Sequence, residues 1–291
     1  MPRRSRFSSV GIVGTGLIGA SAGLAARRAG FTVTGFDLDA MRLATALERG
    51  ALNGASSFAE CAARDVLVIA VPVDATVSII ERLAAAPPPA ALVLDVASVK
   101  SSVAAAGKTL ESFVPSHPLA GRERGGPEAA TAELFDGRCW TYDPAGASAA
   151  AAAVAFIEDL GARPYPIDSA SHDALVALTS HLPQLVAVAL ANRLGENPDA
   201  LPLCGTGFRS MTRLASSPWD VWNSILHGNS RHVAQEVRAL ADILSEFARA
   251  LEAGDYDSLE ARFQSAAAIA AELDENGEAL RTVFVSSEQT P

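Results

Sequence analysis

The fold is decided near the start of the chain, where residues 10–19 read VGIVGTGLIG. The apolar run Val10–Val13 predicts a buried strand, and the helical spacing behind the glycines predicts a helix. Between them, Gly14 permits a tight turn, Gly16 lets a ligand approach the backbone, and Gly19 lets the helix pack closely on the strand. This order predicts a turn whose exposed N–H groups bind the phosphates of a dinucleotide.

A carboxylate after the second predicted strand narrows the choice of dinucleotide. Asp37 follows the strand Thr32–Phe36, at a distance from the glycines where a carboxylate accepts hydrogen bonds from both ribose hydroxyls of NAD. Because Leu38 and Asp39 come next, a 2′-phosphate would meet two carboxylates and no cation. The sequence therefore predicts NAD rather than NADP. The alternative is a glycine turn without a ligand, beside a surface aspartate.

The expected cofactor-binding residues come from three segments. After the strand Val66–Val71, the chain passes either the adenine or the nicotinamide riboside, unless this is a plain strand end. The whole expected set is Gly14, Gly16, Leu17, Ile18, Gly19, Asp37, Val71 and Pro72.

The first half of the chain alternates strands with helices, which is typical of an α/β fold with a parallel sheet. The further strands are predicted at Ala91–Val96, Phe113–Ser116, Cys139–Tyr142 and Arg163–Ile167. The predicted helices are Leu17–Ala29, Asp39–Arg49, Asp74–Ala86, Val99–Leu110 and Ser148–Leu160. We therefore expect residues 1–167 to form a dinucleotide-binding domain of Rossmann type.

After Ile167 the strand pattern stops and helical periodicity takes over. Long helices are predicted at Ser169–Leu194, Trp219–Ala253 and Ser258–Leu280. The first carries a broad apolar stripe, which we expect to pack against a second copy of the chain, with packing inside one chain as the alternative. Residues 168–291 are thus predicted to be an all-helical domain for dimerisation and substrate binding.

Composition excludes several classes of partner. The 291 residues suffice for two modest cores, and the net charge of -10 disfavours nucleic acid or an anionic membrane. Cys61, Cys139 and Cys204 match neither a zinc pattern nor a disulfide framework, which indicates a cytoplasmic protein without a metal. No export signal and no run of about 20 apolar residues is evident.

Two polar segments follow predicted strands, where ligands of such sheets bind. They are Asp95–Ser101 and Ser116–Gly121. The second contains His117, whose imidazole has a pKa suited to moving protons near neutrality. A histidine in a turn can equally be structural or merely exposed.

Together, these segments resemble the prephenate/arogenate (cyclohexadienyl) dehydrogenase family in both motif and order. The motifs that carry the resemblance are Asp95–Lys100, His117–Gly121 with Glu123 and Gly125–Gly126, Ser180–Pro183, and Gly205–Arg213 leading to Trp219 and Trp222. The resemblance spans about 280 residues with the glycine turn in front. It implies an NAD-dependent, homodimeric dehydrogenase whose small substrate is a cyclohexadienyl ring bearing a hydroxyl group and carboxylates.

The resemblance also implies roles for single residues. His117 would accept the proton of the substrate hydroxyl, and Ser98 would bond to that hydroxyl or orient His117, unless it caps the helix Val99–Leu110. Arg213 would bind a substrate carboxylate, for which a planar guanidinium is well suited. Thr206 belongs to the same substrate segment.

The segment around Pro183 bears on the choice of substrate. His181 is expected either to bind substrate or to be a packed structural histidine. The family often has a second histidine where this chain has Gln184. An imidazole suits the side-chain acid of prephenate, whereas a neutral amide also tolerates the ammonium group of arogenate. The reaction type is therefore predicted more firmly than the substrate, with arogenate dehydrogenase as the alternative.

Two other readings remain open from the residues alone. A β-hydroxyacid dehydrogenase would need a lysine on the interdomain helix, and Ser169–Leu194 contains none. A non-catalytic NAD(H)-responsive binding protein would not need polar residues at the strand ends. The remaining histidines, His172, His227 and His232, are expected on helix surfaces or in the core, with no spacing that suggests a metal site.

Overall fold

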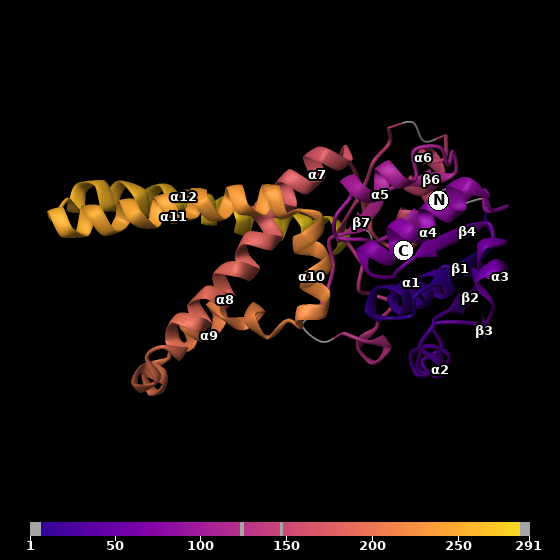
Figure 1. Cartoon of the computed structure of the whole chain (residues 1–291), viewed down its shortest axis with the longest axis horizontal. Helices are drawn as coiled ribbons and strands as arrows, with labels where there is room; N and C mark the ends of the chain where they lie inside the picture. The colour runs from indigo at the N-terminus through magenta and orange to yellow at the C-terminus, as the bar shows by residue number, and fades with distance from the viewer. Residues whose placement is uncertain (1–6, 123–124, 146–147, 286–291) are drawn as a thin grey trace. The chain divides into compact units, whose positions relative to one another are not determined.

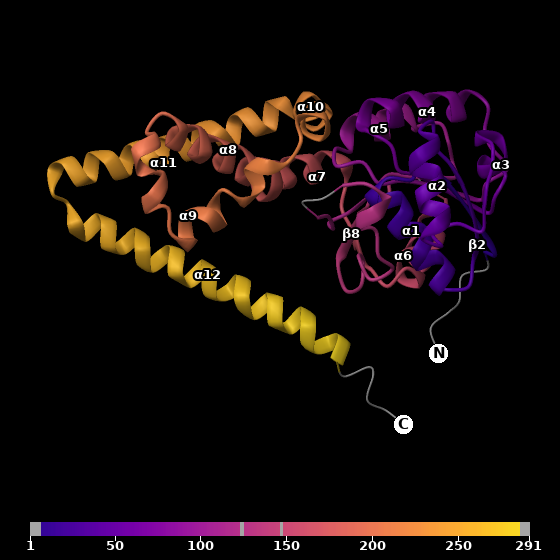
Figure 2. The same cartoon turned by 90° about the horizontal axis from the view of Figure 1, so that it is seen from below.

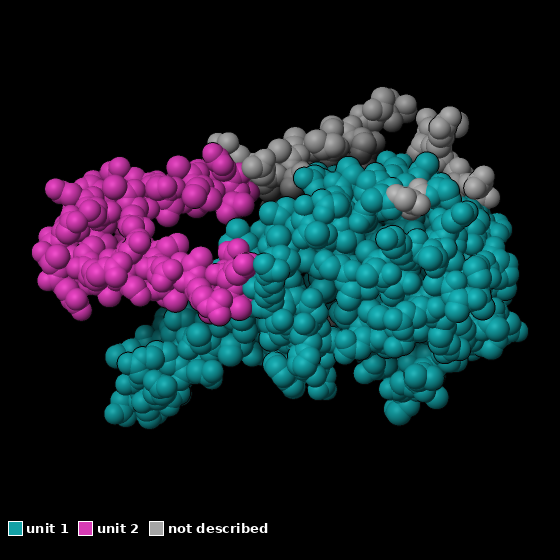
Figure 3. Space-filling model, turned by 45° about the horizontal axis from the view of Figure 1, so that its top comes forward, with its two compact units in different colours: residues 1–233 teal, residues 234–291 magenta. Residues whose placement is uncertain are grey.

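The computed structural model describes residues 7–122, 125–145 and 148–285 of the chain (Figure 1). Contacts divide the chain into two compact units, Met1–Val233 and Ala234–Pro291, which Figure 3 colours teal and magenta. The domain boundary after residue 167 therefore stays a prediction, because the first unit contains both the sheet and several helices beyond that point.

A six-stranded parallel sheet forms the centre of the first unit. Its order, β3-β2-β1-β4-β5-β6, is that of the doubly wound dinucleotide-binding fold, which confirms the predicted fold class. The strands are β1 Ser9–Val13, β2 Thr32–Phe36, β3 Gly54–Ala55, β4 Val66–Ile69, β5 Leu92–Asp95 and β6 Phe113–Val114. β3 was not predicted, because its two residues are too short for a periodic signal.

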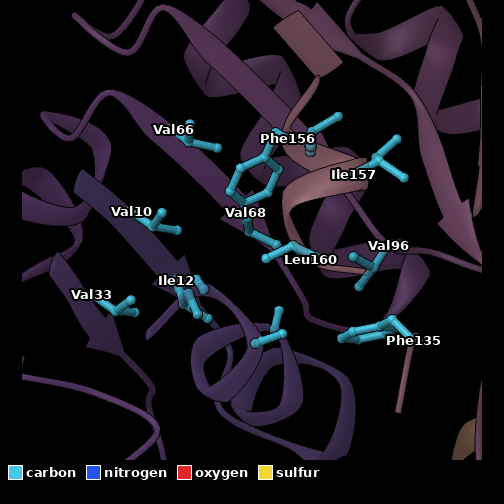
Figure 4. Packing of buried hydrophobic residues seen from close by; sticks show 14 of the residues in the cluster. Val10, Ile12, Val33, Val66, Val68, Val96, Phe135, Phe156, Ile157 and Leu160 are labelled. Atoms are coloured by element: carbon cyan, nitrogen blue, oxygen red, sulfur yellow. The ribbon is translucent and has the colours of Figure 1, made fainter. Parts of the chain in front are cut away.

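Helices cover this sheet and bury its apolar side chains. They are α1 Leu17–Arg28, α2 Ala40–Glu48, α3 Phe58–Ala62, α4 Val73–Ala85, α5 Ser101–Ala106 and α6 Ala150–Asp159. Figure 4 shows Phe156, Ile157 and Leu160, at the end of α6, turned toward Val10, Ile12 and other strand residues, and all of these are fully buried. Burial of this kind is the main favourable contribution to folding and holds the loops at the strand ends in place.

A second, three-stranded sheet holds His117. Its strands are β7 Ser116–Pro118, β8 Cys139–Tyr142 and β9 Arg163–Pro166, with β7 antiparallel to β8. The prediction of one strand over 113–116 with His117 beyond its end was wrong. The chain leaves the first sheet at Val114, and His117 lies in the middle of β7 opposite Thr141.

The predicted helix over 169–194 is interrupted. It consists of α7 Ser169–Val176, a π-helical turn η2 at Ala177–His181, and α8 Leu182–Gly195. Pro183 lies in the first turn of α8, where its missing N–H removes a helical hydrogen bond. Such π turns are frequent at functional sites, because they shift the side chains that follow.

Shorter segments complete the first unit (Figures 1 and 2). They are η1 Pro127–Ala129, η3 Pro198–Leu203, α9 Thr206–Met211, η4 Arg213–Ser216 and α10 Trp219–Gly228. The helix predicted over 219–253 is in fact two helices, since the chain breaks at Asn229 before α11 begins at Ser230.

One helical run among the described residues is long and apolar enough to cross a membrane by length and composition alone. It spans Ser169–Gly195 with a hydropathy of 1.7, and 33% of its most apolar window is buried in the chain. This differs from the expectation that no segment would meet that description. The run carries His172, Asp173 and Gln184, whose side chains are buried and hydrogen-bonded to other groups of the chain.

The second unit is formed by the rest of α11, which ends at Ala253, and by α12 Tyr256–Val285. Figure 2 shows the two helices joined at a turn and spreading apart from it. Near this turn the guanidinium of Arg262 pairs with Glu246 and covers the ring of Phe247. Large apolar side chains remain exposed along both helices, namely Val237, Ile243, Leu244, Leu251, Phe263, Ile269 and Leu273.

Candidate active site

The glycine turn after β1 has the geometry that the sequence predicts. Gly14 adopts a φ of 92°, and a Cβ atom there would lie 2.3 Å from the carbonyl oxygen of Ala70. A Cβ on Gly19 would lie 1.9 Å from the oxygen of Gly14, so the helix could not pack as closely with any other residue. Around Gly16, by contrast, a Cβ would meet nothing within 4 Å. The space that Gly16 leaves open is therefore not filled by the protein.

The start of α1 offers hydrogen-bond donors to a ligand. Gly16 occupies the cap position of α1 and supplies no side-chain acceptor for the first N–H groups. Leu17 and Ile18 are half-buried and pack against the core, which fixes the first turn. Free N–H groups at a helix start beside an open glycine fit the pyrophosphate of a dinucleotide.

Asp37 lies at the end of β2, next to the turn. One of its oxygens accepts hydrogen bonds from the N–H of Thr15, at 2.6 Å, and from its hydroxyl, at 2.9 Å. The other oxygen accepts from the N–H of Asp39 at 2.9 Å. These three bonds hold the carboxylate in place and leave about one of its four lone-pair sites for a ribose hydroxyl. Leu38 beside it is 92% exposed, and no arginine occupies this position.

The expected loop after β4 is short. β4 ends at Ile69, and Pro72 is the cap residue of α4. The carbonyl oxygen of Val71 accepts a hydrogen bond from the hydroxyl of Thr76 at 3.0 Å. Val71 and Pro72 thus lie at the carboxyl end of β4, beside β1, where the strand order of the sheet reverses.

A buried ion pair fixes the chain directly before His117. Lys100 and Asp95 form a salt bridge, and each is at most 2% exposed. The N–H of Ser116 donates to Asp95 at 2.9 Å, and the ammonium of Lys100 donates to the carbonyl oxygen of Ser116 at 2.7 Å. Burial lowers the pKa of Lys100, while the charge of Asp95 opposes that change. Both backbone groups of Ser116 are thereby held, and with them the start of β7.

The imidazole of His117 forms a hydrogen bond with a second histidine. Its Nδ1 lies 3.0 Å from Nε2 of His172 on α7, and the two rings meet edge to face. Burial lowers the pKa of His117 well below 6.5, and the neighbouring His172 and Lys100 lower it further. His117 is therefore uncharged near neutral pH, as a proton acceptor must be.

His172 is in turn held by Asp173. Nδ1 of His172 lies 2.9 Å from a carboxylate oxygen of Asp173, and both residues are 1% exposed. The same carboxylate accepts the N–H groups of Lys100, at 2.7 Å, and Ser101, at 2.8 Å. Burial alone would raise the pKa of Asp173, but these hydrogen bonds outweigh it and hold the pKa below 3.8. Asp173 is thus an anion in a buried site.

Asn229, at the break between α10 and α11, joins the remaining members. Its amide nitrogen donates to the carbonyl oxygen of Asp173 at 2.7 Å and lies 3.3 Å from Nδ1 of His181. Its amide oxygen lies 2.8 Å from Nδ1 of His232. Burial lowers the pKa of His181 to about 4. We call His117, His172, Asp173, His181, Asn229 and His232 the histidine cluster.

The other predicted site residues lie in several places. Gln184 is buried, and its amide nitrogen donates to the carbonyl oxygen of Leu214 at 2.9 Å. This bond ties α8 to η4, the turn that begins with Arg213. Arg213 itself is exposed, as is Thr206 at the start of α9. Glu123 of the expected substrate loop lies outside the described residues.

Ser98 does not cap a helix. The predicted helix over 99–110 is shorter, and α5 starts at Ser101 with Lys100 in the cap position. Within the described part of the chain, the imidazole of His117 is hydrogen-bonded to the side chain of His172 and not to that of Ser98. Ser98 lies two residues before the buried Lys100. We interpret its hydroxyl as available to a ligand.

The sequence did not predict which residues surround His117. His172 was expected on a helix surface or in the core, and it does lie in the core, but its contact with His117 was not predicted, nor were the contacts of Asp173 and Asn229. A usable signal was present, since the adjacent His172 and Asp173 lie in the predominantly apolar helical run Ser169–Gly195. Buried polar groups need partners, so such a pair predicts a polar neighbour elsewhere in the fold.

Other chemistries find no support in the described residues. Within residues 7–122, 125–145 and 148–285, no group of three or more histidines, cysteines and acidic residues could hold a metal ion. The three cysteines are free. A doubly wound sheet, an uncapped glycine turn, an NAD-type aspartate and a neutral histidine define the class of nicotinamide-dependent dehydrogenases.

Comparison with known proteins gives the family. The model of the prephenate dehydrogenase nucleotide-binding domain matches residues 22–165, and that of the prephenate dehydrogenase dimerization domain matches residues 168–265. This chain belongs to the prephenate dehydrogenase family. The predicted family, its enzyme class and its NAD cofactor are thereby confirmed.

Individual relatives agree with this assignment. The chain is 34% identical to the cyclohexadienyl dehydrogenase of Zymomonas mobilis, covering 77% of this chain and 82% of that protein. It is 33% identical to the probable prephenate dehydrogenase NovF of Streptomyces niveus, covering 82% of this chain and 68% of that protein. Among solved structures, Synechocystis arogenate dehydrogenase superposes with a TM-score of 0.75 at 26% identity, over 88% of this chain and 96% of that one.

Proposed function

We propose that this chain converts prephenate to 4-hydroxyphenylpyruvate by NAD-dependent oxidation and decarboxylation, with His117 as the base. The observation that carries the proposal is the state of His117. It is an uncharged imidazole on β7, directly after the Ser116 that Asp95 holds at the end of β5. Its Nδ1 is already bonded, so Nε2 is left for the substrate. Family membership supplies the reaction class, and the geometry supplies the base.

Bound NAD would supply the hydride acceptor for the ring carbon that bears the hydroxyl. Gly14, Gly16, Leu17, Ile18 and Gly19 would hold its pyrophosphate, and Asp37 its ribose. Nε2 of His117 removes the hydroxyl proton as that carbon becomes a carbonyl-like centre. The bond between the ring and its carboxylate then breaks, CO2 leaves, and the electron pair completes the aromatic ring. The resulting phenolate oxygen regains its proton from Nε2 of His117.

Binding of the substrate is assigned to the segment around η4. Arg213 would pair with a substrate carboxylate, because a guanidinium can donate two parallel hydrogen bonds to it. Gln184 supports this role by binding the carbonyl oxygen of Leu214, next to Arg213. Thr206 and Ser98 would donate to other substrate oxygens. The burial of His181 and its contact with Asn229 favour a structural role for this residue over substrate binding.

Arogenate is the second candidate substrate. Gln184 is the observation in its favour, because no second imidazole stands there to attract the side-chain acid of prephenate. The amide nitrogen of Gln184 is, however, already hydrogen-bonded to the carbonyl oxygen of Leu214. It is therefore less available to contact the substrate and to distinguish arogenate from prephenate. We therefore place prephenate first.

The proposal also covers the oligomeric state and the cellular location of the protein. The exposed apolar residues along α11 and α12 support a homodimer, in line with the dimerization domain over 168–265. We also keep the proposed boundary between domains 1–167 and 168–291. Free cysteines and the acidic balance support a cytoplasmic enzyme whose partners are small molecules and a second copy, rather than nucleic acid or a membrane.

Replacing His117 tests the proposal. Asparagine keeps a donor near the Nδ1 position, toward His172, but has no atom in place of Nε2. We expect His117→Asn to lower kcat for NADH formation from prephenate by roughly 10²- to 10⁴-fold while the Kd for NAD is unchanged. Parallel assays with arogenate rank the two substrates. Turnover close to that of the wild type would remove His117 as the base, and a wild type inactive on both substrates would overturn the function.

A further inference from the structure

We propose that His172, held by Asp173, is a positioning residue that fixes the tautomer of His117 with Nε2 unprotonated. The inference rests on the proposed role of His117 and adds two residues that the sequence did not suggest. It concerns hydrogen positions, which follow from the pattern of donors and acceptors rather than from any single distance.

The pattern begins at Asp173, whose carboxylate can only accept hydrogen bonds. It already receives the N–H groups of Lys100 and Ser101, and Nδ1 of His172 is its third neighbour. Nδ1 of His172 must therefore carry a hydrogen. In a neutral imidazole the other nitrogen then has none, so Nε2 of His172 is an acceptor.

The next hydrogen bond determines the tautomer of His117. Nε2 of His172 faces Nδ1 of His117 at 3.0 Å, and two bare nitrogens at that distance would repel each other. Nδ1 of His117 therefore donates, and its Nε2 carries the lone pair that a base needs. Free histidine in water prefers the opposite tautomer, with the hydrogen on Nε2, so the neighbour has to impose the reactive form.

The charges around His117 favour the same tautomer. When His117 takes up a proton at Nε2, it becomes an imidazolium in a site that already disfavours a positive charge. The bond to His172 connects that charge to the anion of Asp173. A carboxylate that holds a catalytic histidine in its reactive tautomer has this effect in serine proteases, where losing the correct tautomer costs about 10⁴-fold in kcat.

The surroundings make the arrangement rigid. Asp173 is bound through its carboxylate to the 100–101 segment and through its carbonyl oxygen to Asn229. His172 and Asp173 are each 1% exposed, so water does not compete for these bonds. The π turn η2 follows directly after α7, which carries both residues. A fixed partner can select one tautomer, whereas a mobile side chain could not.

Nitrogen NMR of the imidazoles tests the inference without any substrate. The chain has five histidines, so long-range proton–nitrogen spectra of the 15N-labelled full-length protein contain five ring systems, and His117→Asn identifies one of them. We expect His117 in the wild type to carry its hydrogen on Nδ1. A hydrogen on Nε2 in the wild type would overturn the inference, even if prephenate is turned over normally.

Two variants at one position give the matched comparison. His172→Leu keeps a side chain of similar size but offers no hydrogen-bond acceptor, and we expect His117 to shift toward the Nε2-protonated tautomer. His172→Gln can place its amide oxygen near the former Nε2 and should restore the wild-type tautomer. The expected kcat falls roughly 10- to 100-fold in His172→Leu and recovers in His172→Gln, with KM and the Kd for NAD near wild type in both.

The outcomes separate this inference from the proposed function. A wild type without activity on prephenate would overturn the function, while its spectrum would still decide the tautomer. An active wild type whose His172→Leu variant keeps both its kcat and its tautomer would overturn the inference alone. If His172→Leu does not fold, the wild-type and His172→Gln spectra still decide it.

Discussion

The glycine turn lies within six consecutive residues, Gly14 to Gly19, whereas the histidine cluster needs side chains from β7, α7, η2 and the break at residue 229. In the turn, each glycine is required by the local backbone geometry or by close packing, and the spacing of the glycines in the sequence is enough to predict this. In the cluster, His117 and His172 are 55 positions apart and meet only because two sheets and a helix fold together. A phosphate-binding site can therefore be formed by residues that are adjacent in sequence. A catalytic base, in contrast, is positioned by residues from several elements of the folded unit.

After the loss of turnover expected for His117→Asn, the next largest effect is expected in η4, the turn that begins with Arg213. Arg213→Gln should raise the KM for prephenate roughly 30-fold or more, which corresponds to about 2 kcal/mol or more at a desolvated charge pair. The Kd for NAD should not change, since the glycine turn is untouched. Steady-state kinetics and NAD titration measure both values.

Arg193→Gln on α8 is the matched control, because Arg193 is exposed and pairs with Glu196. It should leave the KM at the wild-type value. An unaltered KM in Arg213→Gln would refute its role as the carboxylate ligand and would leave the cluster without a substrate anchor in our account.

Two glycines of the turn separate folding from binding. An added methyl at Gly19 meets the oxygen of Gly14, so Gly19→Ala should destabilise the protein by about 1–3 kcal/mol and also weaken NAD binding. An added methyl at Gly16 meets no protein atom within 4 Å. Gly16→Ala should therefore keep the wild-type Tm and lose only NAD affinity. Thermal unfolding and NAD titration of both variants check this, and a normal Kd in Gly16→Ala would contradict the assigned pyrophosphate site.

The smallest expected effect concerns the choice of cofactor. Asp37→Ser combined with Leu38→Arg removes a carboxylate and adds a cation at a side chain that is 92% exposed. The ratio of kcat/KM for NADP over NAD should rise roughly tenfold or more, since a charge-assisted hydrogen bond contributes about 1.5–3 kcal/mol. Leu38→Arg alone is the control and should change the ratio less. A wild type that already prefers NADP would show that Asp37 was misread.

Much of the fold could be predicted because its signals are periodic. The strand Thr32–Phe36 is matched to the residue. The helices predicted beside the first sheet are matched within one or two residues, except over 99–110, and the short helix α3 was not predicted. The failures have physical causes. β3 and β7 are stabilised by pairing with strands already present, and neither is long enough to show a pattern of its own.

The site residues, like the fold, could be predicted only where the local sequence determines them. Gly14, Gly19 and Asp37 lie in the predicted geometry, because local backbone needs determine them. His117 was singled out, but its partner His172 was not, because an apolar helix gives no sign of what lies opposite a polar residue on its face. The break at Asn229 was missed for a related reason, since its amide is required by Asp173 and His181 rather than by its own neighbours in sequence.

A crystal structure of the enzyme with NAD and 4-hydroxyphenylpyruvate tests the central claim most directly. The account predicts Nε2 of His117 within about 3.2 Å of the product hydroxyl and the guanidinium of Arg213, from the same chain or its dimer partner, on a carboxylate of the same molecule. A product hydroxyl bonded to another side chain, with His117 turned away from the ring, would contradict it.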